Sequence, residues 1–148
     1  MKLALNSFLF YFLILCSPSF GESLEKKYIV KTSGLKIGEL EWKIEINNDR
    51  FLNSLELKSM GLLSAIYNFE GRYLSQGLVD AGKLKPNKYQ HFWRTKKTVK
   101  QMELIFEKDA IASIEQLPLE KENIRTDVFS LKQTKDPLSS FLEIVMGG

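Results

Sequence analysis

The feature that most constrains the fold is a strict alternation of polar and apolar residues over positions 39–46. Its apolar members are Leu40, Trp42, Ile44 and Ile46, and its polar members are Glu39, Glu41, Lys43 and Glu45. Successive side chains of a β-strand point to opposite faces of a sheet, so the segment is predicted to be a strand with one apolar and one hydrated face. Strands of this kind form antiparallel sheets that are covered on one side only.

Similar stretches recur along the chain, with turn-forming residues between them. Besides 39–46, strands are predicted over 28–32, 50–58, 67–73, 88–94, 99–107 and 110–114. Turns are expected at 47–49, 95–98 and 108–109, and the segment 77–82 is interpreted as a break in the strand pattern. Regular strands joined by tight turns indicate a mainly β (α+β) fold, built as an antiparallel meander. Residues 116–135 are predicted to form a long loop.

A short amphipathic helix is predicted near the C-terminal end of the sequence. Asp136 can cap its N-terminus, and Pro137 suits the first helical position. Five apolar residues then recur with helical spacing, at Leu138, Phe141, Leu142, Val145 and Met146. Isolated helices of this length are marginal in water, so the helix needs an apolar surface, and the strands upstream must supply it.

The first 21 residues are interpreted as a cleaved secretory signal peptide, which leaves residues 22–148 as a single β-domain. Lys2 precedes a nearly continuous apolar run over 3–15, and Ser19 and Gly21 are the small residues expected before a cleavage site. The run is shorter than the roughly 20 residues that span a bilayer. The predicted localisation is therefore periplasmic.

Cys16, the single cysteine, lies just after this apolar run. A lipoprotein processing site would require a small residue before the cysteine, where this chain has Leu15, so lipid anchoring at Cys16 is the less favoured alternative. Cleavage would leave no thiol for a disulfide. Because Lys2 is the only charged residue removed, the remainder carries a net charge of +2, against +3 for the whole chain. This balance argues against nucleic-acid binding, or polybasic membrane binding, as the main activity.

The order and spacing of several turn motifs carry a family resemblance. These motifs are Gly34-Leu35-Lys36-Ile37-Gly38-Glu39, Ser75-Gln76-Gly77, Gly82-Lys83-Leu84-Lys85-Pro86 and Asp136-Pro137-Leu138-Ser139. Together with the export signal, they resemble the domain of unknown function 3108 family of bacterial envelope proteins. The resemblance implies a curved antiparallel sheet around a helix, similar to the half-barrel of periplasmic lipoprotein carriers, and no established activity. Family members typically continue past the helix with further strands, so the chain is interpreted either as a fragment or as a sheet closed by something else.

No catalytic, metal or cofactor site is predicted. His91 is the only histidine, and in the strand alternation its neighbours are Tyr89 and Trp93, so a structural role is favoured over general-base catalysis. The carboxylates show no ligand-like spacing. The basic residues that follow Trp93, up to Lys100, partly resemble a nucleic-acid surface. A hairpin turn with solubilising lysines is favoured there, with a weak contact to anionic headgroups as the alternative.

An apolar loop over 59–66 interrupts the strand pattern where polar turn residues are expected. Two interpretations stay open: a lip at the mouth of a hydrophobic cavity or an interaction surface, and a short helix packed across the barrel end as core, which is favoured. The candidate ligand-binding residues are four from this loop, Met60, Leu62, Leu63 and Ile66, together with Trp42 and Phe141.

The leading hypothesis is a non-enzymatic periplasmic protein that binds an apolar ligand, such as a lipid or a lipoprotein acyl chain, in the concave face of the sheet. The helix from Asp136 would act as a plug or lid. The alternative is a structural or assembly factor that holds an envelope protein through its sheet edge or long loop. An enzyme acting on a cell-envelope substrate is the third hypothesis.

Overall fold

The structure is a computed structural model that describes residues 21–119 and 127–147. Its elements are β1 (Glu22–Thr32), β2 (Leu35–Asn47), β3 (Arg50–Ser59), α2 (Gly61–Ile66), β4 (Phe69–Asp80), β5 (Lys83–Thr95), β6 (Val99–Glu107), β7 (Ala110–Leu117), the 3-10 turn η1 (Val128–Ser130) and α3 (Pro137–Met146). The predicted signal peptide up to residue 20, with Cys16, lies outside the described residues. No helix within the described ranges is long and apolar enough to cross a membrane.

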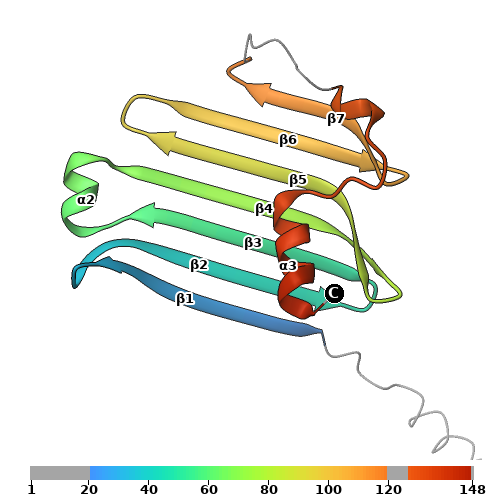
Figure 1. The fold of residues 1–148 in the computed structure, drawn as a ribbon, viewed down its shortest axis with the longest axis horizontal. Coiled ribbons are helices and arrows are strands. Elements are labelled where there is room, and N and C mark those ends of the chain that lie inside the picture. The colour runs from blue at the N-terminus through green and yellow to red at the C-terminus, as the bar shows by residue number, and fades with distance from the viewer. Residues whose placement is uncertain (1–20, 120–126, 148) are drawn as a thin grey trace, which may run out of the picture.

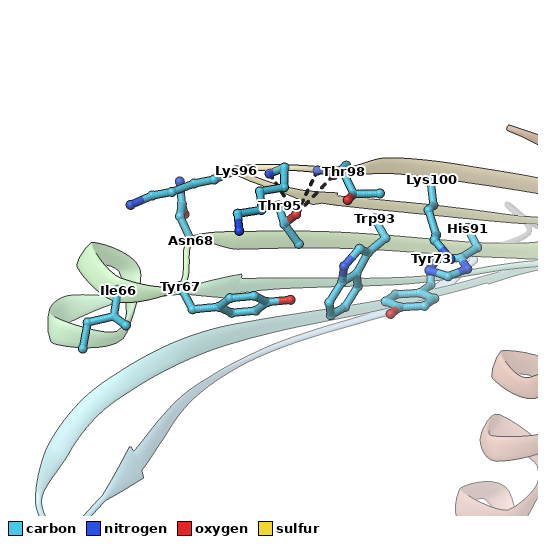
Figure 2. A pocket seen from close by; sticks show the side chains of 11 residues that line it. Ile66, Tyr67, Asn68, Tyr73, His91, Trp93, Thr95, Lys96, Thr98 and Lys100 are labelled. Atoms are coloured by element: carbon cyan, nitrogen blue, oxygen red, sulfur yellow. Dashed lines mark hydrogen bonds between the residues drawn. The ribbon is translucent and has the colours of Figure 1, made fainter. Parts of the chain in front are cut away.

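Seven strands form one unclosed antiparallel sheet in the sequential order β1 to β7. The predicted mainly β meander is therefore confirmed, together with the C-terminal helix that packs on it. Figure 1 shows α3 lying across one face of the sheet, toward one end of the strands. Figure 2 shows that β1 and β2 curve toward the side of the sheet that carries α3, which makes this face concave.

The strand alternation correctly predicts β3 and β6, but it ends β4 too early and starts β5 too late. Strand β4 runs without a break to Asp80, where residues 77–82 were expected to interrupt the pattern. Gly77 lies at a bulge in the pairing with β5, and a Cβ added to Gly77 would lie 2.1 Å from the carbonyl oxygen of Lys85. The glycine therefore permits a close approach of two strands and does not mark a turn. The turn comes later, at Ala81 and Gly82.

The buried face of α3 is narrower than the sequence predicts. Leu138 and Leu142 are buried, as expected, whereas Phe141, Val145 and Met146 are about half exposed. Of the five apolar side chains predicted to share one face of the helix, the sheet therefore buries only two. The helix rests on a single open sheet, so only the stripe that faces the strands is covered.

Two apolar clusters join α3 to the sheet. In the first, Leu142 packs with Ile44, Phe51 and Leu84. In the second, Leu138 packs with Tyr89 and Phe106, and Leu55, Tyr73, Leu104 and Ile111 lie against this group. The two clusters together hold α3 on the concave face of the sheet.

The apolar loop does form the predicted short helix, α2, but it is not core. None of its residues is buried, and Leu62 and Ile66 keep 65% and 75% of their surface exposed. The favoured interpretation of the loop as packed core is therefore wrong. The helix is held by its N-terminal end, where the Met60 amide donates a hydrogen bond to the Ile37 carbonyl at 2.9 Å. It extends past the last residues of β3, and no described element covers its outer side.

Candidate functional site

A pocket occupies the concave face on the side of α2, away from α3. Its volume is about 790 Å³. The lining comes from the end of α2, from β4 and β5, and from the β5–β6 turn with the start of β6; it includes Ile66, Tyr67, Tyr73, His91, Trp93 and Lys96. Figure 2 shows the rings of Tyr73 and Trp93 below the strands, on the side of the sheet where α3 lies.

The floor of the pocket is made of stacked rings. The rings of Tyr73 and His91 stack with centroids 4.7 Å apart. The ring of Trp93 stacks at 5.2 Å on that of Phe69, which lies next to the pocket and does not line it. The strand register explains both pairs. Tyr73 lies directly opposite His91, whereas Trp93 lies opposite Gly71, next to Phe69 on the same face of β4. A Cβ at Gly71 would come within 3.2 Å of both Trp93 and Tyr73. The missing side chain at Gly71 therefore lets the two ring pairs approach each other.

His91 forms part of this floor in an environment that disfavours its charged form. Burial, and then the positive charge of Lys100, lower the pKa of His91 below its usual 6.5. Its Nε2 atom is buried and has no hydrogen-bond partner among the residues that the structure describes. The imidazole is therefore neutral at pH 7, and the floor stays uncharged. Within the described part of the chain, no group of three His, Cys, Asp or Glu residues is placed to hold a metal ion.

The rim of the pocket is basic. The β5–β6 turn is ordered by Thr95, whose Oγ1 accepts hydrogen bonds from the amides of Lys97 and Thr98 at 3.2 and 3.1 Å (Figure 2). Lys96 Nζ donates to the Ala65 carbonyl of α2 at 3.0 Å. These contacts hold cationic side chains beside the aromatic floor.

On the other side of the concave face, a buried carboxylate fixes the start of α3. Asp136 Oδ1 accepts from the amides of Leu138 and Ser139, both at 2.9 Å. Its Oδ2 accepts from Ser75 Oγ at 2.8 Å and from Ser139 Oγ at 2.6 Å. The carboxylate thus caps the helix and also ties it to β4.

A second polar link joins the same turn of α3 to β2 and β3. Asn53 Nδ2 donates to the Leu138 carbonyl at 3.0 Å, and the Trp42 indole donates to Asn53 Oδ1 at 2.7 Å. Further along the helix, Glu143 accepts from the Leu84 amide at 2.8 Å and pairs with Lys135. The buried polar groups of Asn53 and Asp136 thus have partners on both α3 and the sheet, and these bonds position the helix.

The structure separates the six candidate residues predicted from sequence. Ile66 is the only one of the six that lines the pocket. Phe141, on α3, contacts Trp42 of β2, with ring centroids 5.3 Å apart. The other three are Met60, Leu62 and Leu63, which lie in or next to α2 and do not line the pocket.

Sequence reasoning missed most of the aromatic floor. The signal was present in the alternation of Phe69, Gly71 and Tyr73 along β4, and of His91 and Trp93 along β5. Each run resembles ordinary core, and only the strand register places the two runs side by side.

Comparison with known proteins identifies the family and nothing more specific. No curated protein and no solved structure matches the chain significantly. The model of a protein family of unknown function, DUF3108, matches residues 27–145, which is most of the chain and includes the whole sheet from Tyr28 onward together with most of α3. The predicted resemblance is therefore confirmed, and the chain belongs to the DUF3108 family.

Proposed function

We propose that this protein is an exported, periplasmic, non-enzymatic protein that binds an apolar ligand, such as a lipid or a lipoprotein acyl chain, on the concave face of its sheet. The observation that carries the proposal is the pocket on the α2 side of the concave face, with its floor of stacked aromatic rings and its volume of about 790 Å³. Small-molecule pockets typically have volumes of about 300–1,000 Å³ and a mainly apolar lining.

Three features of the floor support an apolar ligand. Trp93 and Tyr73 offer wide ring surfaces, which release much free energy when they are removed from water. His91 is neutral at pH 7 because its pKa is lowered by burial and by Lys100. Tyr73 packs against the cluster that contains Leu138, so α3 supports the floor from outside the pocket.

The proposal is tested by native mass spectrometry of the full chain, expressed with its own N-terminus and recovered from the periplasm, followed by organic extraction. A bound mass of lipid type is expected. Trp93→Glu should lower the bound fraction at least about tenfold, because it puts a carboxylate against the apolar ligand. The matched control is Phe92→Glu, one residue along β5 on the opposite face, where Arg72 and Arg94 flank the ring.

Two outcomes would contradict the proposal. One is an empty protein in the periplasmic preparation. The other is equal loss of ligand in the Trp93→Glu and Phe92→Glu variants, which would show that the effect does not come from the pocket.

A second candidate function is favoured by the sheet edge. Among the strands that the structure describes, the outer strand β1 pairs with β2 alone, and all 11 of its residues are exposed. An unpaired strand edge can add a strand from a partner protein. If the protein acts as a structural or assembly factor through this edge, an envelope protein should stay bound to it at high salt after lipid has been removed.

A further inference from the structure

Three connections of the meander meet at one end of the sheet. They are the β1–β2 turn with its flanking residues (31–37), the β3–β4 connection that contains α2 (59–69), and the β5–β6 turn with its flanking residues (95–100). We refer to these three segments as the basic end. An antiparallel meander places every second connection at the same end, and Figure 1 shows these three together at the left.

The basic end is a continuous surface because its segments are bonded to one another. The Met60 amide donates to the carbonyl of Ile37, which links the second segment to the first. Lys96 Nζ donates to the carbonyl of Ala65, which links the third segment to the second. The three connections therefore present their side chains as one unit.

The charge of this surface has a single sign. Its three segments contain five exposed lysines and no aspartate or glutamate; the lysines are Lys31, Lys36, Lys96, Lys97 and Lys100. The nearest carboxylates along the strands already have cationic partners, since Glu39 pairs with Lys58 and Glu70 pairs with Arg72 and Arg94.

The opposite end of the sheet differs. Each of its three turns mixes both signs of charge; the charged residues there are Asp49 and Arg50, Asp80 and Lys83, and Glu107, Lys108 and Asp109. The net charge of the whole chain is small, but the two ends of the sheet differ in charge: one carries only lysines, and the other carries both signs.

Exposed aliphatic side chains accompany the lysines. Leu35 and Val99 are 58% and 47% exposed, and Leu62 and Ile66 on α2 are more exposed still. Aliphatic side chains next to lysines are typical of surfaces that bind in the interface of an anionic bilayer, where the apolar groups enter the acyl boundary and the ammonium groups meet the headgroups.

We propose that the basic end docks on an anionic lipid surface. A bilayer interface supplies a negative layer for the five lysines and an apolar layer for the aliphatic side chains, whereas an acidic protein surface would satisfy only the lysines. Ile66, Lys96 and Lys97 also line the pocket, so docking places the pocket mouth against the lipid. The docking does not depend on what the pocket holds.

The test is co-sedimentation of the purified full chain with vesicles of phosphatidylcholine, with and without phosphatidylglycerol. Binding is expected only to the vesicles that contain phosphatidylglycerol, and it should weaken at high salt. Lys96→Gln with Lys97→Gln should lower the partition coefficient roughly fivefold for each lysine. Leu62→Ser with Ile66→Ser should weaken binding as well, because it removes the apolar part of the contact.

Matched controls come from surfaces elsewhere on the fold. Lys83→Gln with Lys108→Gln removes the same charge from the opposite end, and Ile144→Ser changes a side chain of similar exposure, 72%, on α3. Both should bind like the unchanged protein. Circular dichroism of each variant shows whether the sheet is retained.

Three outcomes would overturn the docking proposal: equal binding to both kinds of vesicle, unchanged binding of the Lys96→Gln/Lys97→Gln variant, or no vesicle binding at all. The last would leave an acidic protein surface as the occupant. Native mass spectrometry of the same preparations reports the pocket ligand separately, so failure of one proposal does not imply failure of the other.

Discussion

At the scale of the residue, Asp136 connects local and tertiary structure. Its two carboxylate oxygens serve different partners, one the amides of the helix start and the other the hydroxyls of Ser75 and Ser139. The capping role follows from sequence, since an aspartate before a proline is a typical helix start. The link to Ser75, 61 residues away, could not be predicted from spacing. A polar residue within the apolar alternation was the available signal, both at Ser75 and at Asn53.

We expect Asp136→Ala to lower the free energy of unfolding by about 2–4 kcal/mol, because it removes the cap and leaves two buried hydroxyls with poorer partners. Urea unfolding measures this change. The control is Asp127→Ala, which removes the exposed side-chain cap of η1 and should cost less than about 1 kcal/mol. Similar losses in the two variants would contradict the role of Asp136 in joining α3 to the sheet.

The pKa of His91 gives a prediction about pH. Burial and Lys100 lower this pKa below 6.5 in the folded protein, so below pH 6.5 the unfolded chain binds more protons at His91 than the folded chain does. The charged group that acts on the ring is Lys100 on β6. Tyr73 on β4 would also act on it if it ionised, but burial raises the pKa of Tyr73 above its usual 10.0, so it is uncharged in this pH range. The free energy of unfolding should therefore fall as the pH decreases from 6.5 and stay level just above it.

Urea unfolding at a series of pH values between about 7.5 and 5 tests this expectation. His91→Gln should flatten the decrease over this interval. The carboxylates whose pKa lies below its usual 4.5, Glu70, Glu103 and Glu143, titrate at lower pH and should not interfere. An equally steep decrease in His91→Gln would assign the effect to another group.

At the scale of the element, the buried face of α3 should contribute much more to the free energy of unfolding than its exposed face. Leu142→Ala should cost about 2–4 kcal/mol, because Leu142 is fully buried among Ile44, Phe51 and Leu84. Ile144→Ala, on the exposed side, should change stability by less than about 0.5 kcal/mol. Thermal or urea unfolding of the two variants makes the comparison, and equal losses would mean that the helix is rotated relative to the sheet.

The strand β4 shows why element boundaries were harder to predict than element type. Its second half contains Gly77, which reads as a turn residue in sequence. In the fold this glycine allows the Lys85 carbonyl to approach, and the strand continues to Asp80. A glycine within a strand pattern is a signal both for a bulge and for a turn. Only the position of the neighbouring strand shows which of the two is present.

At the scale of the whole molecule, the open sheet should have a gradient of local stability. The central strands β3, β4 and β5 are paired on both sides and contact α3, whereas β1 has one neighbour and no buried residue. Amide hydrogen exchange followed by mass spectrometry should therefore show the least protection in β1 among the described strands, and the most in β3 to β5. Protection of β1 equal to that of β4 would indicate that its outer edge is covered, for example by a second copy.

The sequence by itself determined which segments form strands, that the sheet has one apolar face, and that a capped helix near the end must cover part of it. These properties are local, since they follow from the alternation of residues such as Leu40, Trp42 and Ile44 and from the pair Asp136 and Pro137. Only the tertiary structure decided how much of the face α3 covers, that the rings of Tyr73, His91 and Trp93 form a common floor, and that the lysines gather at one end. Strand register and the path of the meander bring these residues together across large separations in sequence, and the identity of neighbouring residues along the chain does not encode that proximity.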